Sequence, residues 1–502
     1  MSGIRRNTAI ILLSAAWLSA WGQEDMYYGT GLVEDDAEYE KIPQKPTLLT
    51  RDYKILPESF SLRKYCPRVG SQGRYGTCTV WSTTYAARTI AEAIRWGWTD
   101  QNVITEEAFA PLFVYSQIKS KEDNSCLNGA RINQALEMLK RKGAPKLRSF
   151  NIQCADYAPK WVMDEASDYP IDDYFAVFTS HCKSQEEKVY KVKKSLAEER
   201  PVLINMRIPR SFYKAGDTWT PESSNESPVG YHAMCVVGYD DHLDGGAFLI
   251  MNSWSRTWGK DGYTWVKYAD FAKYVDWAFE IYVKKVRYPE VDQEKETVIT
   301  VNNFETNYDQ VFAKVDSNYN DKVEKVLSGS MYIQLSTGER MAQQLTSRNR
   351  ELPVYRAKGK YISGTRYRVY LSNHEPAYVY VIGSDLKNNV SKLFPHAANI
   401  SPALVYSSND IALPSEDYYI EMDNTQGKDY FCLLYSSRAL PIDNIVERIK
   451  KAGGDFDEKL ITALDEYGLV PQEDITYEKG NVSFRAVTNR QVVPIIVEVT
   501  HN

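Results

Sequence analysis

The sequence predicts an α+β fold, with helices before strands in the first half of the chain and a β-rich second half. Three observations lead to this prediction. Apolar residues recur at helical spacing between residues 78 and 142, and strand-like runs follow between residues 202 and 268. Many short strand-like runs with turn residues between them fill residues 325–502. A chain of 502 residues is too long for one ordinary hydrophobic core, so we expect two or three domains.

Four helices are predicted in the first half of the chain. One begins at Cys78 and stops before Gly97, a residue type that often follows the last helical turn. Two more are predicted over residues 106–118 and 132–142 from the spacing of their apolar residues. The capping pattern that begins at Ser184, with a glutamate three residues later, predicts the fourth.

Strands follow these helices along the chain. Apolar runs predict them at residues 202–206, 232–238, 247–251 and 263–268. This order places Cys78 in a helical half and His232 in a strand half of one domain. We expect that domain to extend over residues 51–288. The polar residues 289–324 form a predicted linker.

Residues 325–502 predict a β-rich, sandwich-like accessory domain with two helices. Its helices are expected at residues 442–452 and 457–467. Its strands are expected at residues 330–335, 367–371, 377–382, 418–422, 430–434, 482–487 and 493–499. The run Ala377–Gly383, followed by Leu393-Phe394-Pro395, resembles an accessory domain of unknown function found beside bacterial peptidases and kinases. That resemblance implies no chemistry, and the partner of this domain stays open.

The N-terminus has the features of a targeting segment. Arg5-Arg6 form a basic start, residues 8–21 form a short apolar stretch, and small residues before Gln23 fit a signal-peptidase site. We therefore expect residues 1–22 to be a signal peptide and the protein to be exported, to the periplasm or the extracellular space. A membrane anchor is the alternative, but the stretch is short for a span of about 20 residues. Residues 23–50 are acidic and predict a mobile lead-in.

Composition excludes several classes of partner. The net charge is −6 and no basic block occurs, so we expect no nucleic-acid partner. No later stretch is apolar enough to span a bilayer, so we expect no stable membrane insertion. Seven cysteines are an odd number, which indicates one free reactive thiol, and Cys78 is the candidate. Cys126 and Cys154 could form a bridge, and the sequence leaves the other pairings open.

The chemistry of the chain is concentrated in three segments. Cys78 follows the glycine-containing loop 71–77 at the start of a helix, where free N–H groups and partial positive charge favour a thiolate. His232 begins an apolar strand with small neighbours and can hold the thiol proton as an imidazolium, forming an ion pair. Asn252 can accept a hydrogen bond from the imidazole and orient it. His181 and His242 lie in polar runs and are weaker candidates for the base.

Each of these residues also has a purely structural interpretation. Cys78 could be a buried structural cysteine, which is the commoner fate of a lone cysteine. His232 could be a hydrogen-bonded core histidine, and Asn252-Ser253-Trp254 could be only a strand end. The combination of the three segments in this order favours catalysis.

Gln72, Cys78, His232 and Asn252-Ser253-Trp254, in that order, resemble the papain family of cysteine peptidases over residues 51–288. The resemblance implies a two-lobed fold, a helical lobe plus a β-barrel-like lobe, with the active site between them. It implies Cys78 as nucleophile, His232 as base and acid, Asn252 as its orienting group and Gln72 in the oxyanion hole. It also implies substrate contacts at Gly129 and Trp254, with Trp254 shielding the histidine–asparagine bond. No metal and no cofactor are expected.

The chain departs from the family pattern beside the nucleophile. Tyr75 stands in place of a cysteine, Thr77 in place of a serine and Thr79 in place of a tryptophan. Without the first cysteine a usual disulfide is lost, so its partner, for which Cys126 is the candidate, must be free or paired elsewhere. The change at Thr79 alters the wall beside the nucleophile and puts peptide specificity in question.

The sequence therefore predicts an exported cysteine peptidase that hydrolyses peptide bonds in peptide or protein substrates through an acyl-enzyme on Cys78. One alternative is a catalytically idle homologue that only binds peptides. The other is an acyl or amide transferase that uses the same residues with an amine in place of water.

Overall fold

The computed structural model describes residues 28–45 and 56–283, together with residues 325–501 apart from short gaps. The gaps fall at residues 347–351, 386–388, 398–399, 405–408, 415–417, 423, 425 and 479–480. The predicted signal peptide and linker therefore lie outside the described residues. Among the helices that the structure describes, none has the length and apolar character needed to cross a membrane.

The helix predicted at Cys78 is confirmed. It consists of α2 (Cys78–Val80), a π-helical stretch (Trp81–Arg88) and α3 (Thr89–Trp96) in direct succession. Gly97 ends it in the left-handed conformation, with φ 69°, which glycine adopts without strain.

The remaining helices of this half bring one correction. A single helix over residues 106–118 was a wrong prediction, because Pro111 begins a separate helix after the extended residue Ala110. The Ser184 side chain caps its helix by accepting a hydrogen bond from the Glu187 N–H, as predicted. The helices are α4 (Gln101–Glu106), α5 (Pro111–Ile118), α6 (Ile132–Lys142), α7 (Lys160–Ala166), α8 (Gln185–Ala197) and α9 (Tyr268–Tyr274).

One eight-stranded sheet forms the other half of this domain, in the order β2-β8-β3-β5-β6-β7-β4, with β1 paired to β5. The four predicted strands are present as β3, β5, β6 and β7, and β1, β2, β4 and β8 are additional. The strands are β1 (Ser59–Ser61), β2 (Asp173–Phe178), β3 (Val202–Pro209), β4 (Thr218–Trp219), β5 (Pro228–Asp240), β6 (Ala247–Met251), β7 (Tyr263–Lys267) and β8 (Val275–Tyr282).

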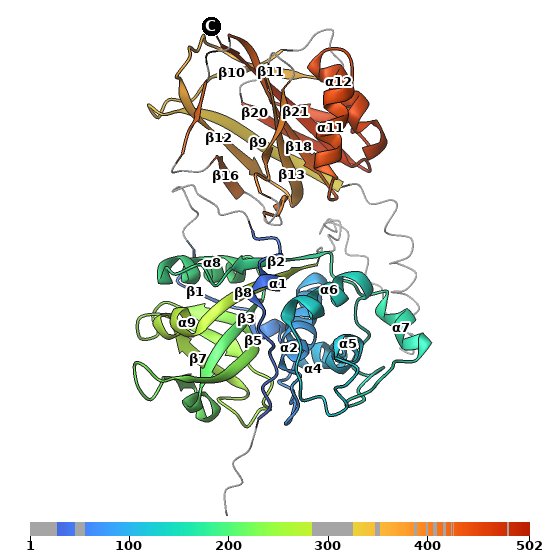
Figure 1. The fold of residues 1–502 in the computed structure, drawn as a ribbon, viewed down its shortest axis with the longest axis vertical. Helices are drawn as coiled ribbons and strands as arrows, with labels where there is room; N and C mark the ends of the chain where they lie inside the picture. Colours follow the sequence, from blue (N-terminus) through green and yellow to red (C-terminus); the bar gives the residue numbers. More distant parts are fainter. Residues whose placement is uncertain are drawn as a thin grey trace, which may run out of the picture.

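Residues 28–45, which we call the N-terminal segment, run between the helical half and the strand half (Figure 1). The segment contains one helical turn, α1 (Asp36–Tyr39), capped by the Asp35 side chain. Tyr39 is fully buried, and Leu32 and Ile42 are nearly so. The prediction of a mobile lead-in was therefore wrong for these residues, because their apolar side chains join the core of the domain.

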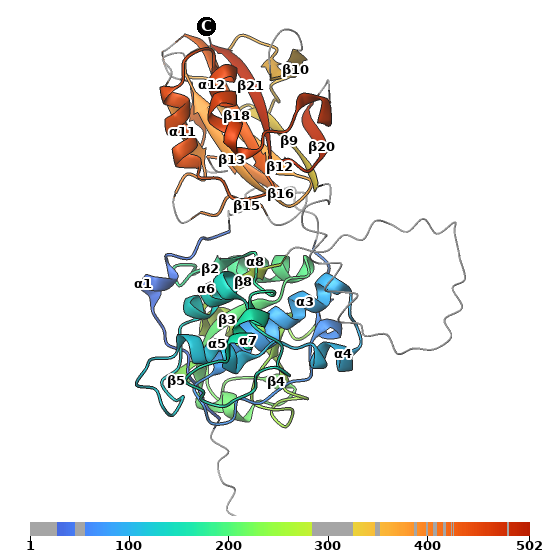
Figure 2. The same cartoon turned by 90° about the vertical axis from the view of Figure 1, so that its right-hand side faces the viewer.

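The accessory domain is a sandwich of two mostly antiparallel sheets, as predicted (Figure 2). One sheet has the order β10-β11-β21-β18-β13-β14 and the other β16-β12-β9-β20-β19, with an apolar core between them. Helices α11 (Ile442–Lys451) and α12 (Phe456–Leu464) cover the outer face of the first sheet through a second apolar cluster. The strands are β9 (Lys325–Leu335), β10 (Gln343–Thr346), β11 (Val354–Ala357), β12 (Arg366–Asn373), β13 (Ala377–Ser384), β14 (Val390–Phe394), β15 (Ala403–Leu404), β16 (Asn409–Leu413), β17 (Ile420–Glu421), β18 (Gly427–Ser436), β19 (Ile475–Tyr477), β20 (Val482–Thr488) and β21 (Val492–His501).

All seven cysteines lie in the described residues, and two of them pair. Cys126 and Cys154 form a disulfide, one of the pairings that the sequence left open, and this accounts for Cys126 after the loss of the family's usual partner. The other five cysteines are free thiols. Among these, Cys432 is buried in the accessory-domain core and has a packing role.

Candidate active site

Cys78 is the first residue of α2, and its side chain is fully buried. Burial raises the pKa of the Cys78 thiol, and this outweighs the backbone N–H groups of Gly31, Thr79 and Ala233, which favour the thiolate. The contact with the Ala233 N–H places the sulfur beside β5, next to the residue that carries the imidazole. The structure therefore brings the nucleophile of the helical half against the strand that bears His232.

His232 and Asn252 come together because β5 and β6 are antiparallel neighbours in the sheet. Asn252 Oδ1 lies 2.7 Å from His232 Nε2. The fully buried Trp254 ring stacks on the imidazole, with ring centroids 4.4 Å apart, and so keeps water from this bond. His232 Nδ1 has no hydrogen-bond partner among the described residues, which leaves it as the nitrogen that can exchange a proton.

Gln72 is buried and its side-chain amide is fixed at both ends. Its Oε1 accepts a hydrogen bond from Ser253 Oγ at 2.6 Å. Its Nε2 donates to the backbone carbonyls of Tyr75 at 2.8 Å and Gly29 at 3.0 Å. The side-chain amide of Gln72 therefore donates to peptide carbonyls, as an oxyanion-hole donor must. In this structure both carbonyls are those of the protein's own main chain, at Gly29 and Tyr75.

The loop that carries Gly129 is held by several polar contacts. The Gly129 N–H donates to the Tyr115 hydroxyl at 3.1 Å, and that hydroxyl donates to Asp123 Oδ2 at 2.7 Å. The Cys126 carbonyl accepts from the Gly76 N–H at 2.8 Å, so the disulfide loop is fastened to the nucleophile loop. Gly129 has φ 80°, a conformation that favours glycine.

Thr79 connects this loop to the nucleophile helix. Its hydroxyl is fully buried and donates to the Ala130 carbonyl at 2.8 Å. The tryptophan that the family pattern places here is therefore replaced by a hydroxyl that positions the main chain of Ala130. The significance of Thr79 was not predicted, because the sequence gives no sign of which backbone group its hydroxyl reaches.

The N-terminal segment occupies the space among these residues. The Gly29 carbonyl accepts from Gln72 Nε2 and, at 3.1 Å, from Trp254 Nε1. The Ala130 N–H donates to the Gly31 carbonyl at 2.9 Å, and the Val33 N–H donates to the Ala130 carbonyl at 3.2 Å.

The two glycines of the segment fit against the domain with no space for a side chain. A Cβ on Gly29 would lie 2.2 Å from the Tyr75 carbonyl oxygen, and one on Gly31 would lie 2.1 Å from that of Gly76. The Tyr28 ring stacks on Trp254 at 5.0 Å. The segment therefore covers the candidate nucleophile, the candidate oxyanion donor and the loop of Gly129 at once.

This coverage explains a difference from the expected charge state. We predicted a thiolate–imidazolium pair, but burial raises the pKa of the Cys78 thiol and lowers the pKa of His232 to about 4. Both groups are therefore neutral near pH 7 in the form described. The physical reason is desolvation, since each side chain is fully buried beneath the segment and Trp254.

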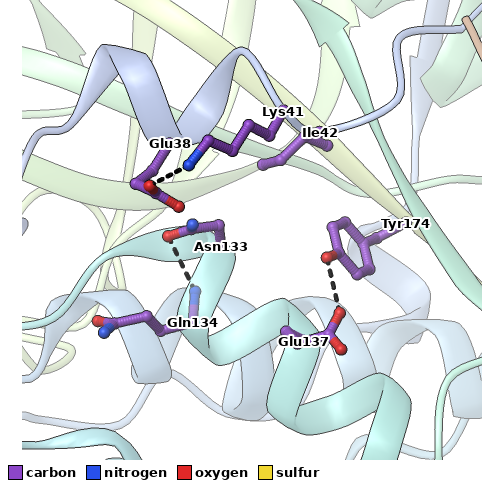
Figure 3. Close-up of a pocket in the computed structure, with 7 residues that line it drawn as sticks. All are labelled: Glu38, Lys41, Ile42, Asn133, Gln134, Glu137 and Tyr174. Carbon is purple, nitrogen blue, oxygen red and sulfur yellow. Dashed lines mark hydrogen bonds and ion pairs between the residues drawn. The ribbon is translucent and has the colours of Figure 1, made fainter. Parts of the chain in front are cut away.

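A pocket of about 220 Å³ has none of the catalytic candidates in its lining (Figure 3). Its lining combines Glu38, Lys41 and Ile42 of the N-terminal segment with Asn133, Gln134, Glu137 and Tyr174 of the domain. The Tyr174 hydroxyl donates to Glu137 at 3.0 Å across its floor.

Besides Thr79, sequence reasoning missed two further features of the site. The role of Ser253 could have been sought, since it lies between two quoted residues, but its bond to Gln72 joins positions 181 residues apart. The Gly29-Thr30-Gly31 run was a weak signal within an acidic stretch. Within the described residues, no cluster of three or more His, Cys, Asp or Glu side chains could hold a metal ion.

Comparison with known proteins finds matches for both domains of the chain. Residues 56–275 match the family model described as papain family cysteine protease, and residues 360–439 match a domain of unknown function (DUF4384). Peptidase 1 of Dermatophagoides farinae is 22% identical over 203 residues, which cover 40% of this chain and 57% of that protein. Cysteine proteinase 3 of Solanum lycopersicum is 26% identical over 232 residues, covering 42% of this chain and 55% of that protein.

The similarity extends to other proteins of the same kind. Cathepsin L2 of Homo sapiens is 24% identical over 222 residues, covering 41% of this chain and 60% of that protein. The chain thus spans little more than half the length of these curated relatives. The crystal structure of xylellain, a cysteine protease from Xylella fastidiosa, matches with a TM-score of 0.42 and 22% identity, covering 52% of this chain and 97% of that one. Residues 56–275 of this chain thus match the papain family of cysteine proteases, and residues 360–439 match a separate domain of unknown function.

Proposed function

We propose that this protein is an exported cysteine peptidase, latent in the form described, that hydrolyses peptide bonds through an acyl-enzyme on Cys78. One observation carries the proposal. Asn252 holds His232 by the bond to Nε2 under Trp254, while Nδ1 stays without a described partner on the strand that contacts Cys78. This is the arrangement that a nucleophile, a base and an orienting group require.

The proposed reaction has two stages. His232 Nδ1 takes the proton of the Cys78 thiol, and the thiolate attacks the carbonyl carbon of the scissile bond. The tetrahedral intermediate collapses, the C–N bond breaks, and His232 returns the proton to the leaving amine. In the second stage His232 removes a proton from water, and the hydroxide displaces Cys78 from the thioester to release the carboxylic acid. The His232 imidazolium then returns its proton to the Cys78 thiolate, which restores the starting state.

Gln72 supports the proposed oxyanion site. Its Nε2 already donates to one peptide carbonyl at 3.0 Å, that of Gly29. In catalysis the same N–H, together with the Cys78 N–H at the helix start, would donate to the oxygen that becomes negative. Ser253 keeps the amide in this orientation through Gln72 Oε1.

The Ala130 main chain supports a peptide as the substrate class. It donates to Gly31 and accepts from Val33, so it already binds an extended peptide through two backbone hydrogen bonds. A substrate would replace the N-terminal segment there and pair in a similar way. Hydrolysis therefore requires that the segment leaves the site.

Export is supported by two observations of different kinds. The first 22 residues have the composition of a signal peptide. The domain also carries a disulfide, Cys126–Cys154, of the kind that persists in oxidising compartments.

An idle peptide-binding homologue is the second candidate, since the site holds a peptide segment in this structure. The test uses a variant that opens the site, Gly31→Ala, with and without Cys78→Ala. We expect Gly31→Ala to hydrolyse a short fluorogenic peptide and to label at Cys78 with an epoxide inhibitor, and the double variant to do neither. Equal hydrolysis by the double variant would end the proposal. Peptide binding without labelling would identify an idle binder, and amide products formed with an added amine would identify a transferase.

A further inference from the structure

The end of the N-terminal segment forms a strand shared by the two domains. On one side, the Lys45 N–H donates to the Ala176 carbonyl at 3.1 Å, and the Ala176 N–H donates to the Pro43 carbonyl at 2.9 Å. This adds residues 43–45 to the edge of the peptidase sheet at β2. On the other side, the Ser401 N–H of the accessory domain donates to the Gln44 carbonyl at 2.9 Å.

The accessory-domain loop that makes this contact is itself firmly attached. The Val379 N–H of β13 donates to the Pro402 carbonyl at 2.8 Å, and β15 pairs with β13 directly after it. The Ala403 N–H donates to Ser401 Oγ at 3.0 Å, which fixes the turn. The bond to Gln44 therefore links the segment to the main sheet of the accessory domain.

Side chains of the two domains also pack against each other beside this shared strand. Phe175 and Tyr282 of the peptidase sheet form one apolar cluster with Ala403 and Tyr378 of the accessory domain. The Tyr378 hydroxyl also lies 3.5 Å from Asp173 Oδ2. The shared strand is thus flanked by a direct contact between the two domains.

The segment continues from this shared strand to the active site without a free stretch. Lys45 forms a buried ion pair with Glu280 at 3.0 Å. Asp36 accepts from Trp277 Nε1 at 2.6 Å, and the buried Tyr39 hydroxyl donates to the Val33 carbonyl at 2.8 Å. Figure 2 shows the segment rising from α1 toward the accessory domain. The residue that the accessory domain contacts, Gln44, and the residue that lies in the active site, Gly31, therefore belong to one continuous segment that is ordered along its length.

We propose that the accessory domain is a regulatory clamp, which holds the N-terminal segment in the active site through residues 400–404 and keeps the peptidase latent. This rests on the proposed function and assigns a task to the domain of unknown function. Because coupling is reciprocal, whatever separates the accessory domain from Gln44 promotes opening of the site, and whatever occupies the site weakens the docking of the accessory domain.

The first test changes the interface in the full chain. Tyr378→Glu places a carboxylate beside Asp173, and Tyr418→Glu is the matched control, since Tyr418 is 70% exposed on the same domain. We expect Tyr378→Glu to raise hydrolysis of a short peptide and the rate of Cys78 labelling by roughly tenfold, the effect of losing about one hydrogen bond with its packing. The control should leave both rates unchanged. In the Gly31→Ala background, where the segment is already displaced, Tyr378→Glu should add nothing.

The second measurement needs no change in the accessory domain. Hydrogen exchange of the Ser401 amide reports its bond to Gln44, and we expect faster exchange in Gly31→Ala than in the unchanged chain. Unaltered Ser401 exchange in a Gly31→Ala chain that is active would overturn the clamp. So would an equal rate increase by Tyr378→Glu in both backgrounds. A Gly31→Ala chain that neither labels nor hydrolyses would instead refute the peptidase proposal, so the two failures are distinguishable.

Discussion

Replacement of Gly31 by alanine is the most direct perturbation of the latent form. The added Cβ would lie 2.1 Å from the Gly76 carbonyl oxygen and 2.3 Å from the Gly76 Cα, and real Cβ atoms do not approach backbone so closely. Gly76 cannot retreat easily, since it lies against the Leu127 carbonyl on its other side. The segment must therefore move out of the site.

The magnitude follows from the bonds that this movement breaks. Five hydrogen bonds hold residues 29–33: three of them join Gly29 to Gly73, Gln72 and Trp254, and two join Gly31 and Val33 to Ala130. At about 1 kcal/mol net for each bond, the segment gains about 5 kcal/mol from them. One decade in an equilibrium constant is about 1.4 kcal/mol, so complete loss would favour opening by about 10³-fold or more. Because a displaced segment can keep some contacts, we expect peptide hydrolysis by the full chain to rise by about 10²–10³-fold.

The assay is the initial rate of hydrolysis of a short fluorogenic peptide, with the Cys78 labelling rate as a second readout. Gly216→Ala is the matched control, because a Cβ there meets nothing within 4 Å. Circular dichroism and the thermal midpoint check that each variant is folded. If folded Gly31→Ala protein showed the rate of the unchanged chain, the segment would not be what limits access to Cys78, and this account of latency would be refuted.

Three further predictions concern single side chains, and the first two are measured in the Gly31→Ala background. Gln72→Ala should lower kcat by about 10²–10³-fold with little change in KM, since one oxyanion donor is lost; an unchanged kcat would move that role elsewhere. Thr79→Val, which removes the donor to the buried Ala130 carbonyl, should raise KM by about five- to tenfold, and Thr79→Ser should restore it; equal KM in all three would deny Thr79 a positioning role. Glu92→Gln breaks the buried ion pair with Arg88 and should destabilise the peptidase domain by about 3–5 kcal/mol at pH 7, measured by denaturant unfolding. Burial raises the pKa of Glu92, but Arg88, Lys146 and Arg95 outweigh it and lower the pKa to about 2, so this stabilisation is complete above pH 4.5 and is lost as the pH falls toward 2; a deficit that stayed constant down to pH 2 would contradict the argument.

Much of the fold was predictable because local patterns determine it. The helix from Cys78 to Gly97, the α6 helix and the strand β6 all follow from apolar spacing and from glycine stop signals. The split between α4 and α5 was missed, although Pro111 was a visible signal for a new helix start. Strands β2 and β8 were missed because most of their residues are buried, so neither shows a polar–apolar alternation.

The candidate site divides in the same way. Cys78, His232, Asn252 and Gln72 could be proposed from the sequence because the chemistry calls for those residue types and their order resembles the papain family pattern. The bond between Ser253 and Gln72, and the bond between Thr79 and Ala130, depend on how distant segments meet, and no local pattern encodes that. The occupation of the site by residues 28–33 was hidden for another reason, since an acidic composition with two glycines is also typical of a disordered tail.

The Cys126–Cys154 bridge gives the domain two opposed redox requirements. Attack on a carbonyl needs Cys78 in its reduced state, whereas the loop that holds Gly129 is closed by an oxidised pair. One hydrogen bond connects the disulfide loop to the loop of the nucleophile. It runs from the Gly76 N–H, two residues before Cys78, to the Cys126 carbonyl. A strong reductant would regenerate an oxidised Cys78 and at the same time loosen the loop of Gly129, the proposed binding edge for a peptide. The rate of peptide hydrolysis is therefore expected to rise and then fall as the concentration of reductant increases. Both a too oxidising and a too reducing environment would lower the activity of the opened enzyme.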